Sequence, residues 1–290
     1  MAAPGRTEHV IIISIDGGSP ADIKKSQMPV LTQLAREGAV TWMAQTIRPS
    51  ITLPAHTSML TGVQMAKHGI TWNDWVPTNP VVSVPTVFTA AKAAGYSTAM
   101  FVAKEKFRQL LQPGTVDEFS FKRAASRGVV KSDSGGKKDK KKEASVTAIT
   151  VATSAAEYIV RHKPGLCFIH FADPDSVGHK HGWSSPEQLK AFAEVDAALG
   201  VVRQALKQSG LATNSVVLIT ADHGGKGKGH TENIPENMTI PWIAWGQGVK
   251  PDFQITAPVN TCDTAATALW LLGLKPAAPL DGAPVTSAFE

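Results

Sequence analysis

Three apolar runs of the 290-residue chain are each followed by side chains that bind metal ions. In sequence order these side chains are Asp16, Asp175, His179, Asp222, His223 and His230. An Asp-Gly pair after a strand is usually a turn, and a lone histidine is usually a structural polar group. Together, however, three carboxylates and three imidazoles supply six ligands, which suits two metal ions with mixed nitrogen and oxygen coordination. Zinc fits this donor set best, and manganese is second.

The spacing of two of these candidates predicts a shared helical face. Asp175 and His179 are four residues apart, so one helical turn would place both on the same side. His181 could replace His179 as the ligand, although the four-residue spacing favours His179. Asp173 raises the same question beside Asp175.

A two-metal centre usually stabilises the attacking and leaving oxygens of a phosphoryl transfer, which requires a nucleophile. Pro54 suits the first turn of a helix, so Thr52 is expected at or just before the helix N-terminus. Unpaired N–H groups there favour anions, and metal coordination would lower the pKa of the hydroxyl. The alternative is an ordinary threonine cap.

Strand-like and helical patterns alternate along the chain and would position these side chains. We expect strands at 9–15, 97–102, 166–171, 215–220 and 242–245, and helices at 28–38, 87–94, 147–160, 186–207 and 262–272. This alternation predicts an α/β sandwich with a mainly parallel central sheet. Ligands of such sheets gather at the carboxyl ends of the strands, where the candidate residues lie.

The composition, 43% apolar and 18% charged, is that of a globular protein. Of the net charge of +5, residues 131–143 contribute +3, because six lysines stand there against three acids. That stretch holds no aromatic residue to stack on a base, so the basic pI does not indicate a nucleic-acid partner. We expect a single catalytic domain over 1–290 that contains a Lys-rich mobile loop at 126–145.

Cys167 and Cys262 are too few to staple a fold of this size. No apolar run approaches the roughly 18 residues of a membrane span, so none is expected. The first strand-like run follows a short polar segment without a secretory leader. The protein is therefore expected to be periplasmic or secreted if a leader was removed, and otherwise cytoplasmic.

Five blocks resemble the alkaline phosphatase superfamily and are most similar to its type I phosphodiesterase/nucleotide pyrophosphatase branch. These blocks are Ile15-Asp16-Gly17, Thr52-Leu53-Pro54-Ala55-His56, Pro174-Asp175-Ser176-Val177-Gly178-His179, Asp222-His223-Gly224 and His230. Their order and spacing match over nearly the whole chain. The resemblance implies an alkaline-phosphatase-like α/β/α sandwich and a two-metal phosphodiesterase acting on a small phosphoester, possibly a nucleotide.

The resemblance also implies a role for each residue. Asp16, Thr52, Asp222 and His223 would hold the ion that activates the nucleophile, and Asp175, His179 and His230 would hold the ion beside the leaving group. Thr52 would attack phosphorus to give a covalent phosphothreonine-type intermediate. Asn73, which follows His68-Gly69-Ile70, would bind the phosphate together with the N–H of Thr52 or Leu53.

Other enzymes remain alternatives on the same site. A phosphomonoesterase shares the metal set, and Lys104, Lys106 or Arg48 could contact the additional phosphate oxygens. A phosphonoacetate-type hydrolase uses a similar layout. A sulfatase is disfavoured because Thr52 cannot be oxidised to formylglycine.

Three further points stay open at this level. The aromatic residue that stacks a base in relatives is not identifiable, although Trp72, Trp75 and Trp183 are candidates. Outside enzymes, the chain could be a metal-binding scaffold or a polyanion-binding module that uses the Lys-rich loop. The oligomeric state is unknown.

Overall fold

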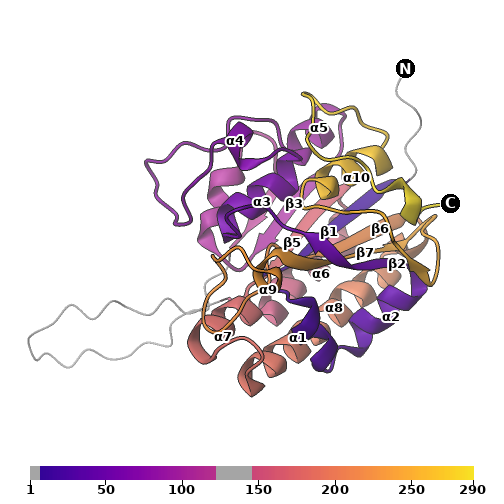
Figure 1. Ribbon diagram of the computed structural model, residues 1–290. Coiled ribbons are helices and arrows are strands. Elements are labelled where there is room, and N and C mark those ends of the chain that lie inside the picture. Colours follow the sequence, from indigo (N-terminus) through magenta and orange to yellow (C-terminus); the bar gives the residue numbers. More distant parts are fainter. Residues whose placement is uncertain (1–6, 122–145) are drawn as a thin grey trace, which may run out of the picture.

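A computed structural model describes residues 7–121 and 146–290, which form a central sheet with helices on both faces (Figure 1). The Lys-rich stretch at 126–145 lies outside the described residues. The single domain over 1–290 stays a prediction. None of the helices in the described ranges combines the length and apolar character needed to cross a membrane.

The sheet has eight strands in the described part of the chain, in the order β4-β3-β5-β1-β6-β7-β2-β8. The strands are β1 (His9–Ile15), β2 (Ala39–Gln45), β3 (Thr98–Val102), β4 (Glu118–Ser120), β5 (Leu166–Phe171), β6 (Ser215–Thr220), β7 (Thr239–Gly246) and β8 (Phe253–Gln254). The five strands from β4 to β6 are mutually parallel, and β7 is antiparallel to both of its neighbours. The sheet is therefore mainly parallel, as predicted.

Helices lie on both sides of this sheet. They are α1 (Pro20–Lys25), α2 (Pro29–Glu37), α3 (Thr52–Thr61), α4 (Met65–His68), α5 (Val87–Ala93), α6 (Ala148–His162), α7 (Asp173–His181), α8 (Pro186–Gln208), α9 (Pro235–Met238) and α10 (Asp263–Leu271), with short 3₁₀ turns η1 (Glu105–Leu110), η2 (Leu211–Thr213) and η3 (Thr286–Ala288). Helices α3, α5 and α10 cover one face, whereas α1, α2, α6 and α8 cover the other (Figure 1).

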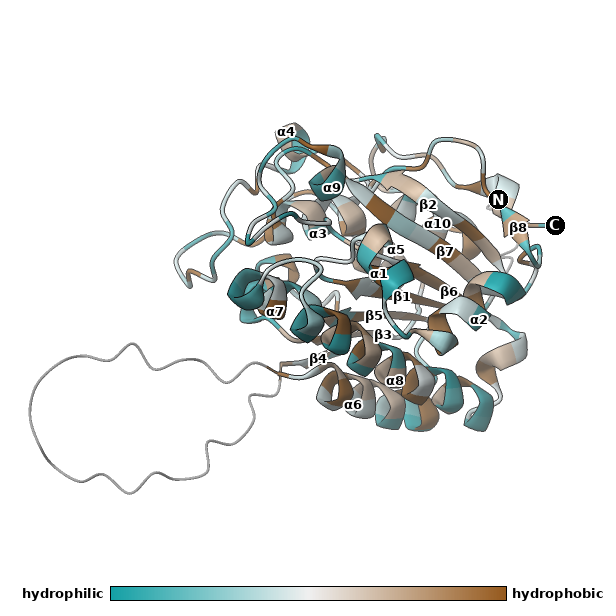
Figure 2. Cartoon of the chain, turned by 60° about the horizontal axis from the view of Figure 1, so that its bottom comes forward, coloured by the Kyte–Doolittle hydropathy of each residue, from teal (hydrophilic) through white to brown (hydrophobic). Residues whose placement is uncertain are grey.

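Strand β1 shows why the sequence forms a sheet that is buried on both faces. Val10 and Ile12 pack into the core beneath α3, α5 and α10. Ile11, Ile13 and Ile15 point the opposite way, into the core beneath α2, α6 and α8. This alternation is the two-residue period of a strand, and Figure 2 shows the apolar strands enclosed between the helices.

The expected elements all occur, with ends shifted by at most three residues. Strands β2, β4 and β8 and the short helices α1, α4 and α9 were not predicted. Polar Thr41 and Gln45 interrupt the apolar pattern of β2, and exposed Met43 disguises its alternating burial. Strands β5, β1 and β6 are adjacent, so their carboxyl ends meet at one place on the sheet edge.

Gly17, directly after β1, is needed both for its backbone conformation and for its lack of a side chain. Its φ is +72°, and a Cβ there would lie 3.0 Å from the Cα of Asp175. Gly69 also has a φ of +72°, but a Cβ there would meet nothing within 4 Å. The two glycines thus share the conformational requirement and differ in crowding.

We predict that Gly69→Ala lowers the free energy of unfolding by about 1–2 kcal/mol through backbone strain alone. Gly17→Ala should cost about 1–3 kcal/mol more, because the methyl group also collides with α7. Urea unfolding in the presence of a chelator measures both. Equal losses for the two variants would show that Gly17 and Asp175 are not in close contact.

Candidate metal centre

The six candidate ligands predicted from the sequence meet at the carboxyl ends of β1, β5 and β6. They form two groups within the described residues, in each of which the ligand atoms lie within 4.8 Å of one another. We call Asp16, Asp222 and His223 cluster A, and Asp175, His179 and His230 cluster B. The resemblance implied the same division of these six residues, with Thr52 as a further ligand beside cluster A, and the metal-binding role of each residue stays a prediction.

Cluster A is completely buried. The Nε2 atom of His223 lies 3.2 Å from Oδ2 of Asp222 and 3.5 Å from Oδ1 of Asp16. Asp16 directly follows β1, and the other two residues follow β6. The neighbouring strands thus place all three side chains on one spot.

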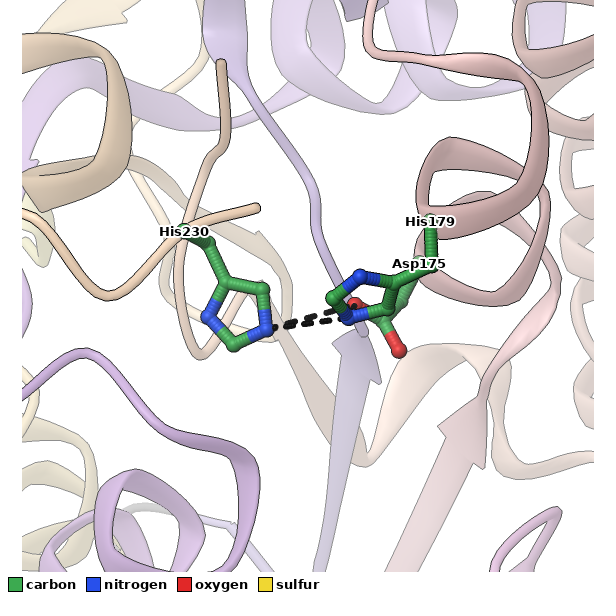
Figure 3. Close-up of side chains that lie close together, drawn as sticks. All are labelled: Asp175, His179 and His230. Atoms are coloured by element: carbon green, nitrogen blue, oxygen red, sulfur yellow. Dashed lines mark hydrogen bonds and ion pairs between the residues drawn. The ribbon is translucent and has the colours of Figure 1, made fainter. Parts of the chain in front are cut away.

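Cluster B joins helix α7 to the loop after β6 (Figure 3). Asp175 and His179 lie one turn apart on α7, with 3.3 Å between Oδ1 and Nε2, as the spacing predicted. His230 brings its Nε2 to 3.2 Å from Nε2 of His179 and 3.7 Å from Oδ1 of Asp175. The three ligand atoms therefore point toward a common centre.

Each histidine of the two clusters is held in the same tautomer. The Nδ1–H groups donate to main-chain carbonyls, and these pairs are His223 with Gly224 (2.8 Å), His179 with Lys228 (2.9 Å) and His230 with Ser50 (2.6 Å). Such a bond leaves the Nε2 lone pair free to bind a cation and fixes the orientation of the ring.

Several buried atoms of the clusters have no hydrogen-bond partner among the described residues. They are Oδ1 of Asp16, Oδ1 of Asp175, Oδ2 of Asp222 and Nε2 of His223. Unpaired buried polar atoms are rare and costly. Ligands of one tetrahedral zinc ion lie roughly 3.3–3.6 Å apart, close to the distances within each cluster. The residues therefore fit two divalent cations.

Burial and mutual repulsion act on the carboxylates. Burial, followed by the charge of Asp16, raises the pKa of Asp222 well above its ordinary value. Burial also acts to raise the pKa of Asp16, but Lys104 and His170 outweigh it and hold the pKa of Asp16 low. A bound cation would relieve the same repulsion.

Lys104 is placed between the two clusters. Its Nζ lies 2.7 Å from Oδ2 of Asp16 and 2.6 Å from Oδ2 of Asp175. It therefore touches one carboxylate of each cluster on the oxygen that faces away from the other ligands. The sequence identified Lys104 only as one of three cations able to reach a phosphate.

Thr52 is buried at the first position of α3, as its distance from Pro54 predicted. Two contacts anchor this segment. The carbonyl of Ser50 accepts the hydrogen bond from His230 of cluster B, and the carbonyl of Thr52 accepts one from Nδ1–H of His56 at 2.7 Å. The helix N-terminus is thus fixed to a candidate ligand.

Asn73 lies beside the same helix end. Its Oδ1 accepts a hydrogen bond from the N–H of Leu53 at 2.9 Å. That N–H was one of two expected to hold a phosphate oxygen, and here it binds Asn73 instead. The amide Nδ2–H₂ group of Asn73 and the N–H of Thr52 are then the candidate donors to a phosphate oxygen.

Sequence reasoning missed two buried histidines. His170 was not among the candidate site residues, yet its Nε2–H donates to Oδ2 of Asp16 at 2.8 Å. His56 bonds through Nε2 to Oγ of Ser14 at 2.7 Å and lies 3.5 Å from Oδ2 of Asp222. The signal that could have identified them is a histidine within an otherwise apolar strand, for His170, or within a buried helix, for His56.

The remaining alternatives lie outside both clusters. His181 pairs with Glu187 instead, with 3.6 Å between its Nδ1 and the Glu187 carboxylate. Asp173 also belongs to neither cluster. Trp72 donates its indole N–H to Gln109. Trp183 packs against cluster B, with ring centroids 5.4 Å from His179 and 5.9 Å from His230.

The model of the type I phosphodiesterase/nucleotide pyrophosphatase family matches residues 10–228. The match spans most of the chain and includes every residue of the two clusters except His230. The chain belongs to this family.

One relative is human ectonucleotide pyrophosphatase/phosphodiesterase family member 7, which is 24% identical over 227 residues. That match covers 76% of this chain and 48% of the relative. The chain spans about half the length of the curated relatives that it matches first.

Solved structures confirm the alkaline-phosphatase-like α/β/α fold. Murine ectonucleotide pyrophosphatase/phosphodiesterase 5, solved as an inactive threonine-to-alanine variant in complex with AMP, superposes with a TM-score of 0.79 at 15% identity, over 98% of this chain and 100% of that chain. A phosphonate monoester hydrolase from Silicibacter pomeroyi gives a TM-score of 0.67 at 17% identity, over 96% and 75% of the two chains.

Protons should compete with cations for cluster B. The Asp175 carboxylate, 3.3 Å away, raises the pKa of His179, whereas burial lowers the pKa of His230 and lowers that of His223 to about 4. As the pH falls, His179 is therefore the first of these to take up a proton, which a metal ion must displace.

We predict that the affinity for Mn²⁺ decreases as the pH is lowered below the pKa of His179. If binding of the ion releases one proton, the decrease is up to about tenfold per pH unit. Calorimetric titration in two buffers of different ionisation enthalpy measures both affinity and proton release. His181→Ala is the matched control and should behave as the wild type. Binding that is independent of pH would contradict the assignment of His179.

Proposed function

We propose that the protein is a zinc-dependent phosphodiesterase/nucleotide pyrophosphatase that acts through a covalent phosphothreonine-type intermediate. The observation that carries this proposal is the pair of clusters beside the N-terminus of α3. One ligand of cluster B, His230, donates a hydrogen bond to the carbonyl of Ser50, two residues before Thr52.

Cluster A together with Thr52 would hold one zinc ion, and cluster B would hold the second. Imidazole nitrogens and carboxylate oxygens without thiolates suit zinc, with manganese second. When bound, the two ions supply charge stabilisation for the attacking and the leaving oxygens.

The chain's own residues then carry out an in-line displacement. The hydroxyl of Thr52 loses its proton and its Oγ1 forms a bond to phosphorus, while the bond from phosphorus to the leaving oxygen breaks and that oxygen takes up a proton. Asn73 and the N–H of Thr52 would donate to the non-bridging oxygens, where negative charge develops. Water then attacks phosphorus from the opposite direction, which releases the product and restores the Thr52 hydroxyl.

Family membership supports this reaction class, and two relatives support the nucleotide as substrate class. Human family member 7 bears the name of an ectonucleotide pyrophosphatase/phosphodiesterase, and the murine structure contains AMP. The threonine-to-alanine variant of that murine enzyme is inactive, which agrees with a nucleophilic role for Thr52.

We expect Thr52→Ala to lower kcat by at least about 10³-fold, because no other hydroxyl occupies the start of α3. Binding of Mn²⁺ should weaken far less, since three ligands of each cluster remain. Thr52→Ser, which keeps the hydroxyl, is the matched control and should retain measurable turnover. Wild-type rates in the alanine variant would remove Thr52 as the nucleophile.

The substrate class is tested with zinc-loaded protein on bis-p-nitrophenyl phosphate and p-nitrophenyl phosphate, with a chelated sample beside each. We expect chelator-sensitive hydrolysis with higher kcat/KM for the diester. Preference for the monoester would instead identify a phosphatase on the same site. Absence of activity on both, with two ions bound, would point to phosphonates or to a metal-binding scaffold.

A further inference from the structure

Lys104 connects the two clusters through one carboxylate oxygen of Asp16 and one of Asp175. Its ammonium group contacts Oδ2 of both Asp16 and Asp175, at 2.7 and 2.6 Å. The Oδ1 atom of each carboxylate faces its own cluster and has no hydrogen-bond partner. The two oxygens of each carboxylate are thus divided between Lys104 and a cluster.

This arrangement continues along the segment that follows β3. The N–H of Ala103 donates to Nδ1 of His170 at 3.4 Å, and Nε2–H of His170 donates to Oδ2 of Asp16. The side chain of Lys104 is only 18% exposed, and both carboxylates are buried. Ala103 and Lys104 therefore form a second layer behind the ligands, one by main chain and the other by side chain.

We propose that Lys104 is a positioning residue that holds Asp16 and Asp175 in the orientation that presents Oδ1 to each cluster. This inference rests on the metal centre of the proposed function. Because Lys104 contacts one carboxylate of each cluster, it fixes cluster A and cluster B relative to each other. Residues that hydrogen-bond to a metal ligand without binding the metal themselves typically contribute about 10–100-fold to metal affinity or activity.

The positive charge of Lys104 allows a positioning role to be distinguished from a purely electrostatic one. An ammonium group repels divalent cations, so a lysine that acted through its charge alone would weaken metal binding, and its removal would strengthen it. A lysine that orients the ligands has the opposite effect. The sign of the change therefore separates the two roles.

The experiment is a titration of metal-free protein with Mn²⁺, followed by the electron paramagnetic resonance signal of the free ion. We expect Lys104→Met to raise the dissociation constant by about 10–100-fold. Lys104→Gln, which keeps a hydrogen-bond donor without the charge, should bind Mn²⁺ more tightly than the methionine variant. Lys92→Met is the matched control, because Lys92 pairs with Asp117 at the surface, and its affinity should equal that of the wild type.

Circular dichroism and the melting temperature establish that each variant is folded. If Lys104→Met does not fold, the Mn²⁺ affinity of Lys104→Gln is compared with that of the wild type instead. Unchanged or tighter Mn²⁺ binding in both Lys104 variants would overturn the proposal. So would an increase in KM alone at unchanged Mn²⁺ affinity, which would assign Lys104 to the substrate. Wild-type protein that binds no Mn²⁺ would overturn the metal centre itself and with it the proposed function.

Discussion

Three buried carboxylates crowded at one edge of the sheet are the feature on which the rest of the site depends. Asp16, Asp175 and Asp222 lie where water cannot solvate their charges, and burying an unpaired charge is costly. The surroundings offset part of this cost. Lys104 contacts two of the carboxylates, and the N–H groups of Gly17 and His223 donate to Oδ1 of Asp222 at 3.1 and 3.0 Å. The oxygens left over are those that face the imidazoles.

The sheet topology explains why these residues meet. Because β5, β1 and β6 are adjacent and parallel, segments that are far apart in the chain end at the same edge. Helix α7 then begins directly after β5, and its first turn brings Asp175 against Gly17. A Cβ at position 17 would lie only 3.0 Å from the Cα of Asp175, so a side chain there would displace α7. The close approach of cluster A and cluster B therefore depends on the strand order and on a residue without a Cβ.

Much of this could be predicted from the sequence, since it depends on local patterns. The β-branched run before Asp16 identifies a buried strand, the Asp175–His179 spacing identifies a helical turn, and Pro54 locates the start of α3. The division of six ligands into two clusters came from the family resemblance, because spacing alone does not show which residues meet in space.

Other parts of the site depend on contacts between distant segments. Lys104 contacts Asp175, 71 residues away, and His170 contacts Asp16 over 154 residues. In the sequence, Lys104 resembles a surface lysine and His170 a polar interruption of a strand. Strand β2 was missed for a related reason, because its half-polar pattern becomes meaningful only once β7 lies beside it.

We expect cluster A and cluster B each to hold one metal ion. The most direct test is a crystal structure of the zinc-soaked protein with anomalous data collected on both sides of the zinc absorption edge. We expect two zinc peaks, one among Asp16, Asp222 and His223 and the other among Asp175, His179 and His230. A single peak, or peaks outside these residues, would contradict this expectation.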